Sequence, residues 1–323
     1  MDLIDHPDNP LPPGGKAVAI DTSDRRRLRA ARFLPEAGGQ IRGTVVVLQG
    51  RTEFIEKYAE TIADLLARRF AVVLFDWRGQ GGSERLLNDP QRGFVEDFRE
   101  YDRDFEAVVK QLVLPDCPPP YFALAHSTGG NVFLRMEPVM RHRFSRAVLT
   151  APLLGLGDYG APQGVIEAVA GVFEVLGLGD RYVLGGGPHT ISRMAFEGNP
   201  LTSDAGRFAR FHAIANAAEH LSIGAATWTW VKAACRSMAF VTDPVRATGC
   251  RTPMLIIESD ADRIVSRAAI EAVLPHLRLA RRLIIPGARH EILMERDSLR
   301  AQFWAAFDAF VPGEPNNSAP EFF

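Results

Sequence analysis

Tyr121-Phe122-Ala123-Leu124-Ala125-His126-Ser127-Thr128-Gly129-Gly130 is the segment from which the fold can be worked out. Its first four residues are apolar and suit a buried strand, small residues around a serine follow, and residues 131–136 continue as a helical stretch. This order of strand, sharp turn and helix is the setting in which a G-x-S-x-G motif forms a nucleophile elbow. Ala125 stands where the motif has its first glycine and is small enough for a tight turn. We therefore predict that Ser127 is a nucleophile exposed above the end of a strand.

Further apolar runs along the chain alternate with helical patterns. Segments 54–65 and 98–112 carry apolar residues at the spacing of one helix face. Alternation of buried strands with amphipathic helices is typical of a parallel sheet covered on both sides. The predicted fold class is therefore α/β, with a mostly parallel central sheet flanked by helices. The strands are expected at 44–48, 72–75, 121–124, 147–149, 254–257 and 282–285.

The alternation stops after Leu149 and resumes at Arg251. Gly-rich loops and helical segments without a clear buried strand lie between, so we expect an inserted, mainly helical cap. Because ligands of open α/β sheets bind at the carboxyl ends of the strands, we favour a lid over such a site to a mere packing elaboration. The expected parts are a flexible N-terminal tail (1–15), a core (16–152 and 251–311), the cap (153–250) and a flexible C-terminal tail (312–323).

The overall composition argues against several classes of protein. The 323 residues include 37 Lys and Arg against 39 Asp and Glu, a formal net charge of -2, so no general basic field favours a nucleic-acid backbone. The three cysteines lie far apart and indicate neither a disulfide framework nor a zinc site. The acidic first residues differ from a secretory signal, and no apolar run has the length of a membrane span. We expect a cytoplasmic protein without a nucleic-acid partner.

A serine nucleophile needs a general base and an acid that orients it, and in folds of this kind their chain order is serine, acid, histidine. His290 follows the last expected strand and takes the final position of that order, so it is the predicted base. His126 is excluded because it adjoins Ser127 in the turn. Asp262 follows the preceding strand and is favoured as the acid, with Asp260 as the alternative.

Two backbone N–H groups are predicted to hold the oxyanion that forms at the substrate carbonyl. The Thr128 N–H lies at the start of the helix after the elbow, where helix donors point at negative charge. The second donor should come from the loop after the strand at 44–48, in which Gly50 lets the chain turn and Arg51 offers its N–H.

On these residues the chain resembles a serine hydrolase of the α/β-hydrolase superfamily, in its lysophospholipase and monoacylglycerol lipase branch. Within that branch it looks closest to the bacterial lysophospholipase L2-like subgroup. Two departures are Ala125 in place of glycine and Gln49 where many relatives carry histidine. The segments that carry the resemblance are 49–58, 76–83, 125–130, 197–204, 262–265 and 287–290.

The resemblance implies a carboxylic-ester hydrolase that acts on single-chain lipids such as lysophospholipids or monoacylglycerols through an acyl-enzyme. It implies no metal or organic cofactor. A peptidase of the proline-iminopeptidase type or a short-chain esterase would use the same three residues, and a non-catalytic binding protein on this fold is a third interpretation. An apolar tunnel under the cap would favour lipid, whereas an acidic pocket would favour a substrate amine.

The cap offers weaker signals. Phe173, Trp228 and Trp230 supply large apolar surface and are candidates for substrate binding, although a packed core explains them equally well. An apolar cap could also touch a membrane, so peripheral contact with its inner face is part of the expectation, whereas the oligomeric state is left open. Arg207 is one of several cap cations that could bind a phosphate headgroup, but the sequence does not fix the direction in which its side chain points. The arginine-rich run 25–29 is expected to be a solvated strand face rather than a membrane contact.

Overall fold

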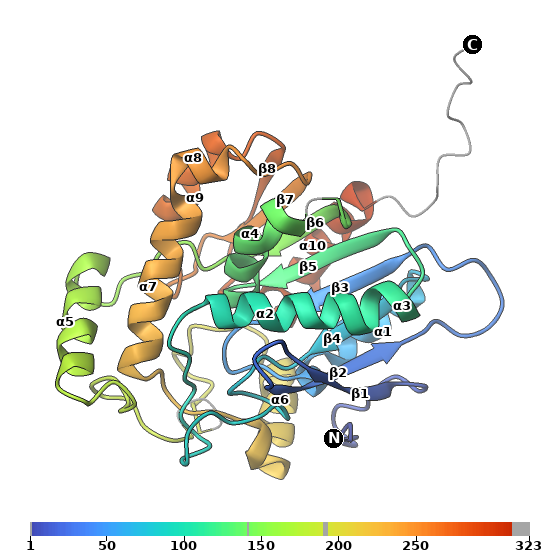
Figure 1. Cartoon of the computed structure of the whole chain (residues 1–323). Helices are drawn as coiled ribbons and strands as arrows, with labels where there is room; N and C mark the ends of the chain where they lie inside the picture. The colour runs from blue at the N-terminus through green and yellow to red at the C-terminus, as the bar shows by residue number, and fades with distance from the viewer. Residues whose placement is uncertain (1, 141, 190–192, 312–323) are drawn as a thin grey trace.

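The computed structural model describes residues 2–140, 142–189 and 193–311. In this part of the chain one sheet of eight strands forms the centre, in the order β1-β2-β4-β3-β5-β6-β7-β8 (Figure 1). Strands β3 to β8 run parallel, and β1 and β2 pair antiparallel at one edge. The predicted α/β fold with a mostly parallel sheet is thereby confirmed. The strands are β1 (Lys16–Asp21), β2 (Arg27–Phe33), β3 (Thr44–Leu48), β4 (Ala71–Phe75), β5 (Tyr121–His126), β6 (Phe144–Thr150), β7 (Met254–Ser259) and β8 (Ala280–Ile285).

Helices cover both faces because successive strand residues point to opposite sides of a sheet. Val45 and Val47 pack with one apolar cluster that includes α1 and α10, whereas Val46 and Leu48 pack with the cluster of α2, α4 and α9. The core helices are α1 (Ala59–Ala67), α2 (Arg99–Val108), α3 (Leu114–Asp116), α4 (Thr128–Met140), α9 (Arg267–Val273) and α10 (Asp297–Phe310). Short helical turns are η1 (Ile55–Tyr58), η2 (Val109–Val113), η3 (Glu219–Leu221), η4 (Leu274–His276) and η5 (Ile292–Met294).

The segment between β6 and β7 is mainly helical. Its helices are α5 (Gln163–Val175), α6 (Ala205–Ala217), α7 (Trp228–Thr242) and α8 (Pro244–Ala247). Figure 1 shows α5 at the outer side of α7, while α6 lies apart from both, nearer to β1 and β2. Isolated bridges join this segment to the core at Gly93 with Ala226 and at Leu156 with Val265.

The position of Arg29 shows that the prediction of a solvated arginine-rich run at 25–29 is wrong for this residue. Its side chain is 2% exposed in β2 and lies 2.7 Å from both Glu56 and Asp76. Two carboxylates around one guanidinium satisfy its charge, which is the condition under which an arginine can be buried. Arg29 of β2 is therefore held by ion pairs inside the protein.

The N-terminal segment lies against the same buried pair. The Ile4 N–H donates to Glu56 Oε1 at 3.0 Å, and the Asn9 side chain donates to the Glu56 carbonyl at 2.8 Å. Leu3 and Leu11 pack on the core from outside. The predicted C-terminal tail, 312–323, lies outside the described residues. Within the ranges that are described, no helix is both long and apolar enough to cross a membrane.

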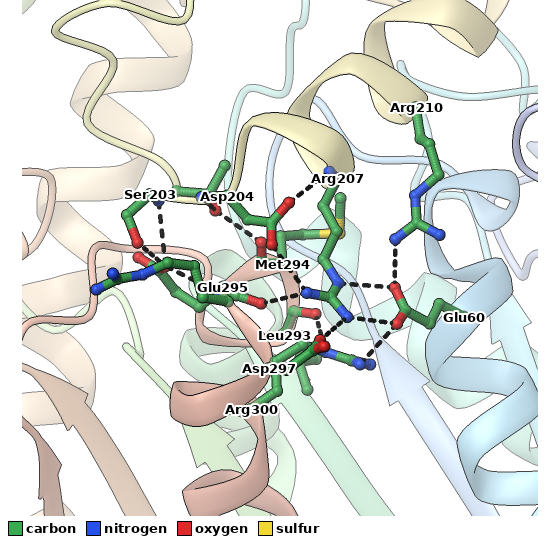
Figure 2. A network of polar contacts seen from close by, with 12 residues as sticks. Glu60, Ser203, Asp204, Arg207, Arg210, Leu293, Met294, Glu295, Asp297 and Arg300 are labelled. Atoms are coloured by element: carbon green, nitrogen blue, oxygen red, sulfur yellow. Dashed lines mark hydrogen bonds and ion pairs between the residues drawn. The ribbon is translucent and has the colours of Figure 1, made fainter.

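A cluster of charges ties cap helix α6 to the core (Figure 2). Arg207 donates to Glu60 of α1 at 2.6 and 2.8 Å and to Asp297 of α10 at 2.6 Å. Arg210 and Arg300 also bind the Glu60 carboxylate, at 2.7 and 2.8 Å. Burial raises the pKa of Glu60, but the hydrogen bond from Arg207 and the surrounding arginine charges outweigh this and lower the pKa to about 2. Arg207 and Arg210 therefore form ion pairs that attach the cap to the core, and these contacts replace the predicted contact with a headgroup.

We expect Arg207→Met to destabilise the fold by about 2–3 kcal/mol, because it leaves Glu60 and its neighbours with one cation fewer in a largely buried place. Arg210→Met should have a smaller effect, about 1 kcal/mol or less, since Arg210 is more exposed and contacts Glu60 alone. Urea unfolding of both variants measures the difference. If Arg207→Met were as stable as the wild type, the ion pairs of Arg207 would not contribute to the attachment of α6 to the core.

The same carboxylate predicts how stability depends on pH. The folded pKa of Glu60 is about 2, below its ordinary value of 4.5, so its contribution is complete above pH 4.5 and is lost as pH falls toward 2. Arg207→Met should lose less stability than the wild type over this range.

Candidate active site

Ser127 occupies the turn between β5 and α4, as predicted. Its φ is +49°, in the left-handed region that non-glycine residues rarely adopt. Backbone hydrogen bonds hold it there: the Ser127 N–H donates to Thr150 at 3.0 Å, and its carbonyl accepts from the Leu153 N–H at 2.9 Å. Strain of this kind is maintained when the surrounding structure fixes the chain. The turn therefore holds the Ser127 side chain in one place at the end of β5.

The small residues of the motif are required by close backbone contacts. A Cβ atom at Gly129 would lie 2.2 Å from the Leu48 carbonyl oxygen, and one at Gly130 would lie 2.8 Å from the Pro152 side chain. Ala125 is fully buried, so its methyl group is accommodated where the motif has its first glycine. Alanine at this position is thus compatible with the elbow.

His290 and Asp262 are brought together at the neighbouring strand ends. His290 Nδ1 lies 2.7 Å from Asp262 Oδ2, and both side chains are at most 5% exposed. Asp262 Oδ1 accepts from the N–H groups of Ile264 at 2.7 Å and Val265 at 3.2 Å. Burial acts to raise the pKa of Asp262, but the His290 charge and these hydrogen bonds outweigh it, so the pKa is lowered. The carboxylate is ionised and orients the imidazole ring.

Asp260, the alternative acid, is placed differently. It is exposed, and its carboxylate accepts from the Gly287 N–H at 2.5 Å. It therefore caps the loop after β8, while Asp262 is the carboxylate that His290 contacts.

His126 connects the elbow with the histidine loop. Its ring lies 4.8 Å from the His290 ring, centroid to centroid, and its Nδ1 lies 3.1 Å from both oxygens of Thr150. Burial lowers the pKa of His126 to about 4, and the positive charges of His290 and Lys57 act in the same direction against Glu53. His126 is thus a neutral neighbour of the predicted base at physiological pH.

The loop that carries the predicted oxyanion donor lies against this histidine pair. A Cβ atom at Gly50 would be 3.0 Å from the His126 ring, so the loop passes directly beside the elbow. The Gly50 N–H donates to Glu53, and the Trp77 indole donates to the Gln49 carbonyl at 2.9 Å. The Gln49 side chain itself donates to Asp76 at 3.3 Å. Hydrogen bonds at Gln49 and Gly50 therefore hold the loop that offers the Arg51 N–H.

A buried ion cluster of Glu53, Lys57 and Glu291, not found from sequence, joins the two loops. Lys57 Nζ lies 2.9 Å from Glu53 and 2.6 Å from Glu291, the residue after His290. Tyr58 also donates to Glu53 at 2.6 Å. Burial disfavours the charge on Lys57, but Glu291 and Glu53 outweigh this and raise its pKa. In the sequence, the four-residue spacing of Glu53 and Lys57, which fits one helical turn, is the only local feature that could have suggested this cluster.

We expect Lys57→Met to destabilise the protein by about 3–5 kcal/mol, because it leaves two buried carboxylates without their common cation. Lys232→Met is a matched control, since Lys232 pairs with the more exposed Glu174 on the cap and should contribute at most about 1 kcal/mol. Urea unfolding followed by circular dichroism measures both. A loss for Lys57→Met no larger than for Lys232→Met would show that the cluster does not stabilise the fold.

The predicted substrate-binding residues lie in two places. Phe173 of α5 stacks on Trp228 of α7, with ring centroids 4.3 Å apart, and so joins the two cap helices. Trp230 instead faces the core, where its indole donates to the Tyr101 hydroxyl at 3.1 Å. Their role toward substrate stays a prediction. Among residues 2–140, 142–189 and 193–311, no group of histidine, cysteine and acidic side chains has the arrangement of a metal site.

Known proteins resemble this chain over most of its length. A family model described as serine aminopeptidase, S33, matches residues 39–297. Lysophospholipase L2 of Escherichia coli is 32% identical over 269 residues, which cover 80% of this chain and 76% of that protein. Probable lysophospholipase L2 of Haemophilus influenzae is 26% identical over 290 residues, 90% of each chain.

Solved structures show the same fold at low identity. A thermostable carboxyl esterase from Bacillus coagulans, in complex with glycerol, superposes with a TM-score of 0.71 at 18% identity, covering 92% of this chain and 97% of the esterase. A monoglyceride lipase variant from Saccharomyces cerevisiae superposes with a TM-score of 0.71 at 16% identity, covering 92% and 95% of the two chains.

Proposed function

Because the chain belongs to the serine aminopeptidase S33 family of α/β hydrolases, we propose that it hydrolyses carboxylic esters of single-chain lipids, either lysophospholipids or monoacylglycerols. The hydrogen bond between His290 and Asp262, beside the turn that holds Ser127, is the observation that carries a hydrolytic mechanism. The two relatives named lysophospholipase L2 support the lipid substrate, since the similarity extends over most of each chain.

In the proposed reaction Ser127 Oγ attacks the ester carbonyl carbon. His290 takes the serine proton as the bond forms and returns it to the leaving alcohol when the carbon–oxygen bond breaks. Asp262 holds the ring in the required tautomer and stabilises its positive charge. A water molecule, activated by the same histidine, then cleaves the acyl-enzyme and releases the fatty acid.

The negative charge that develops on the carbonyl oxygen is held by the N–H groups of Arg51 and Thr128 in this proposal. The Thr128 amide lies at the N-terminus of α4, where the helix favours negative charge. The Arg51 amide lies in the loop that the ion cluster connects to the histidine loop. Donors fixed in advance lower the barrier because they need no reorganisation during the reaction.

Product release from a substrate panel tests the proposal. The panel contains mono-oleoyl glycerol, oleoyl-lysophosphatidylcholine, p-nitrophenyl acetate and a proline amide, each with the wild type and with Ser127→Ala. Serine-dependent release of oleate from either lipid supports the proposal. Cleavage of the short ester or the proline amide alone would leave the nucleophile in place and refute the lipid assignment.

An aminopeptidase is the second candidate, and the description of the matched family favours including it. An aminopeptidase must bind the free amine of its substrate, for which a carboxylate facing the nucleophile is the expected group. Selective cleavage of the proline amide would establish this alternative.

We also propose that α5 contacts the membrane surface from which a lipid would be drawn. Its apolar side chains are unusually exposed, with Val165 at 51%, Val172 at 58%, Val175 at 87% and Leu176 at 66%. An apolar helix face of this kind partitions into the interface of a bilayer.

Val175→Glu is expected to reduce binding to phosphatidylcholine vesicles several-fold, because a charge is placed on the most exposed apolar position of α5. Co-sedimentation with the vesicles measures this, and Val139→Glu, on an exposed position of core helix α4, is the matched control. Equal losses for the two variants would exclude α5 as the specific contact.

A further inference from the structure

The Arg51 side chain lies where the core meets the cap. Its Nη2 donates to the Gly224 carbonyl at 3.0 Å, and its guanidinium carbon lies 5.0 Å from the ring centroid of Trp230. A Cβ atom at Gly93 would be 3.0 Å from the same nitrogen, so glycine at that position leaves room for the guanidinium. The group is thus enclosed by one core loop and two parts of the cap.

The positive charge of Arg51 has no carboxylate partner within the described ranges. No acidic side chain there lies at ion-pairing distance, and Nε is buried without a hydrogen-bond acceptor. Arg29 and Arg78, which are more deeply buried than Arg51, each contact two or more carboxylates. Burial lowers the pKa of Arg51 to about 10, so the group stays charged at neutral pH. A partly buried charge with no carboxylate partner and with a buried, unpaired Nε is unfavourable for stability, which points to a ligand that completes it.

The position of Arg51 next to the reacting groups suggests which ligand this is. Its own backbone N–H is the proposed oxyanion donor, so the side chain starts from the residue that would hold the substrate carbonyl. Tyr159 interacts electrostatically with both Arg51 and Asp262, which places the guanidinium on the same side of the molecule as the predicted acid. A group attached near the scissile ester can therefore reach it.

We propose that the Arg51 guanidinium binds the phosphate of a phosphate-bearing single-chain lipid and makes the enzyme favour such lipids over neutral monoacylglycerols. A guanidinium matches phosphate oxygens with two parallel hydrogen bonds, and Nε with one terminal nitrogen forms such a pair. In a lysophospholipid only the glycerol carbons separate the ester from the phosphate, so both groups can be held at once. This inference rests on the proposed function, since it assigns a specificity residue to the same site.

Arg85 provides a matched control. Like Arg51 it is partly buried, burial lowers its pKa to about 10, and it donates to the carbonyls of His220 and Ser222 in the cap segment that Arg51 contacts. It differs because further bonds to the Gly79 and Gly81 carbonyls occupy its donors. Arg85→Gln therefore removes a similar link between core and cap without removing an anion-binding group.

The test compares two pairs of ligands that differ only by the phosphate. The first readout is the ratio of kcat/KM for oleoyl-lysophosphatidic acid to that for mono-oleoyl glycerol. The second is the ratio of dissociation constants for their ether-linked analogues, which are not hydrolysed, measured by calorimetry. The variants are Arg51→Gln, Arg51→Lys and Arg85→Gln in the full chain. A general disturbance of the oxyanion loop affects both members of a pair, so each ratio reports the phosphate contact.

We expect Arg51→Gln to lower the kcat/KM ratio and to raise the ratio of dissociation constants, each roughly 10- to 100-fold, the range for a charged hydrogen-bond pair. Arg51→Lys should keep part of the preference, and Arg85→Gln should leave the ratios within twofold. Equal losses for phosphate and neutral lipids in Arg51→Gln would overturn the proposal, as would an equal change in Arg85→Gln. Inorganic phosphate that binds as tightly as the ether-linked phosphate lipid would identify a free-phosphate site and overturn the lipid assignment.

The binding readout is independent of the proposed nucleophile. If Ser127→Ala keeps full turnover, the proposed catalytic function fails, while the dissociation constants still decide whether Arg51 recognises phosphate. If turnover depends on Ser127 but the binding ratio does not depend on Arg51, the function stands and this inference fails.

Discussion

Ser127→Ala should lower kcat for fatty-acid release by about 10³-fold or more, because it removes the only atom in the proposed mechanism that can form the acyl-enzyme. The backbone of the turn is held by hydrogen bonds from the Ser127 N–H to the Thr150 carbonyl and from the Leu153 N–H to the Ser127 carbonyl, which the substitution does not touch. The thermal unfolding transition should therefore stay within a few degrees of the wild type. Steady-state kinetics with mono-oleoyl glycerol and oleoyl-lysophosphatidylcholine measure the loss.

Ser298→Ala is the matched control, since Ser298 lies exposed on α10. A fluorophosphonate probe should label the wild type and Ser298→Ala but not Ser127→Ala. Turnover by Ser127→Ala at the rate of the wild type would remove Ser127 from the mechanism, and labelling of this variant would point to another nucleophile.

Asp262→Asn is expected to lower kcat by about 10³- to 10⁴-fold. The carboxylate accepts from His290 through one oxygen and from the amides of Ile264 and Val265 through the other. An amide that keeps the two backbone bonds with its oxygen must turn its NH₂ group toward His290 Nδ1. The neutral ring then carries its proton on Nε2 and cannot accept the serine proton there. The loss should appear mainly in kcat, because the substrate does not touch Asp262.

Asp260→Asn serves as the comparison for this prediction. Its carboxylate accepts from the Gly287 N–H in the loop, and an amide oxygen can accept the same bond. We expect its kcat to change less than threefold, in keeping with a surface position. A larger loss for Asp260→Asn than for Asp262→Asn would transfer the role of the acid to Asp260.

The sequence predicted the parallel part of the sheet because strands buried on both faces read as continuous apolar runs. The runs at 44–48 and 254–257 coincide with β3 and the first part of β7. β1 and β2 were missed because they pair antiparallel at one edge and carry charged residues. Arg29 shows the reason most clearly, since the partners that allow its burial come from distant parts of the chain.

In the candidate site, too, features that depend on local sequence could be predicted, and contacts between distant residues could not. Ser127, Asp262 and His290 could be proposed because each follows a strand that the pattern reveals, and their order along the chain is diagnostic. The Glu53–Lys57–Glu291 cluster could not, because Lys57 and Glu291 are 234 positions apart and nothing local relates them. The sequence also could not show where the Arg207 side chain points, since its partner Glu60 lies 147 positions away.

Hydrogen bonds between the cap and the histidine loop divide the cap into two mechanical parts. The His290 and Glu291 N–H groups donate to the carbonyls of Pro200 and Leu201, at 3.4 and 2.8 Å, and α6 is clamped beside them by Arg207. This half cannot swing away without pulling the base from its acid. If the cap opens to admit substrate, we expect the motion in the other half, where α5 packs on α7, because the catalytic geometry could then persist during opening.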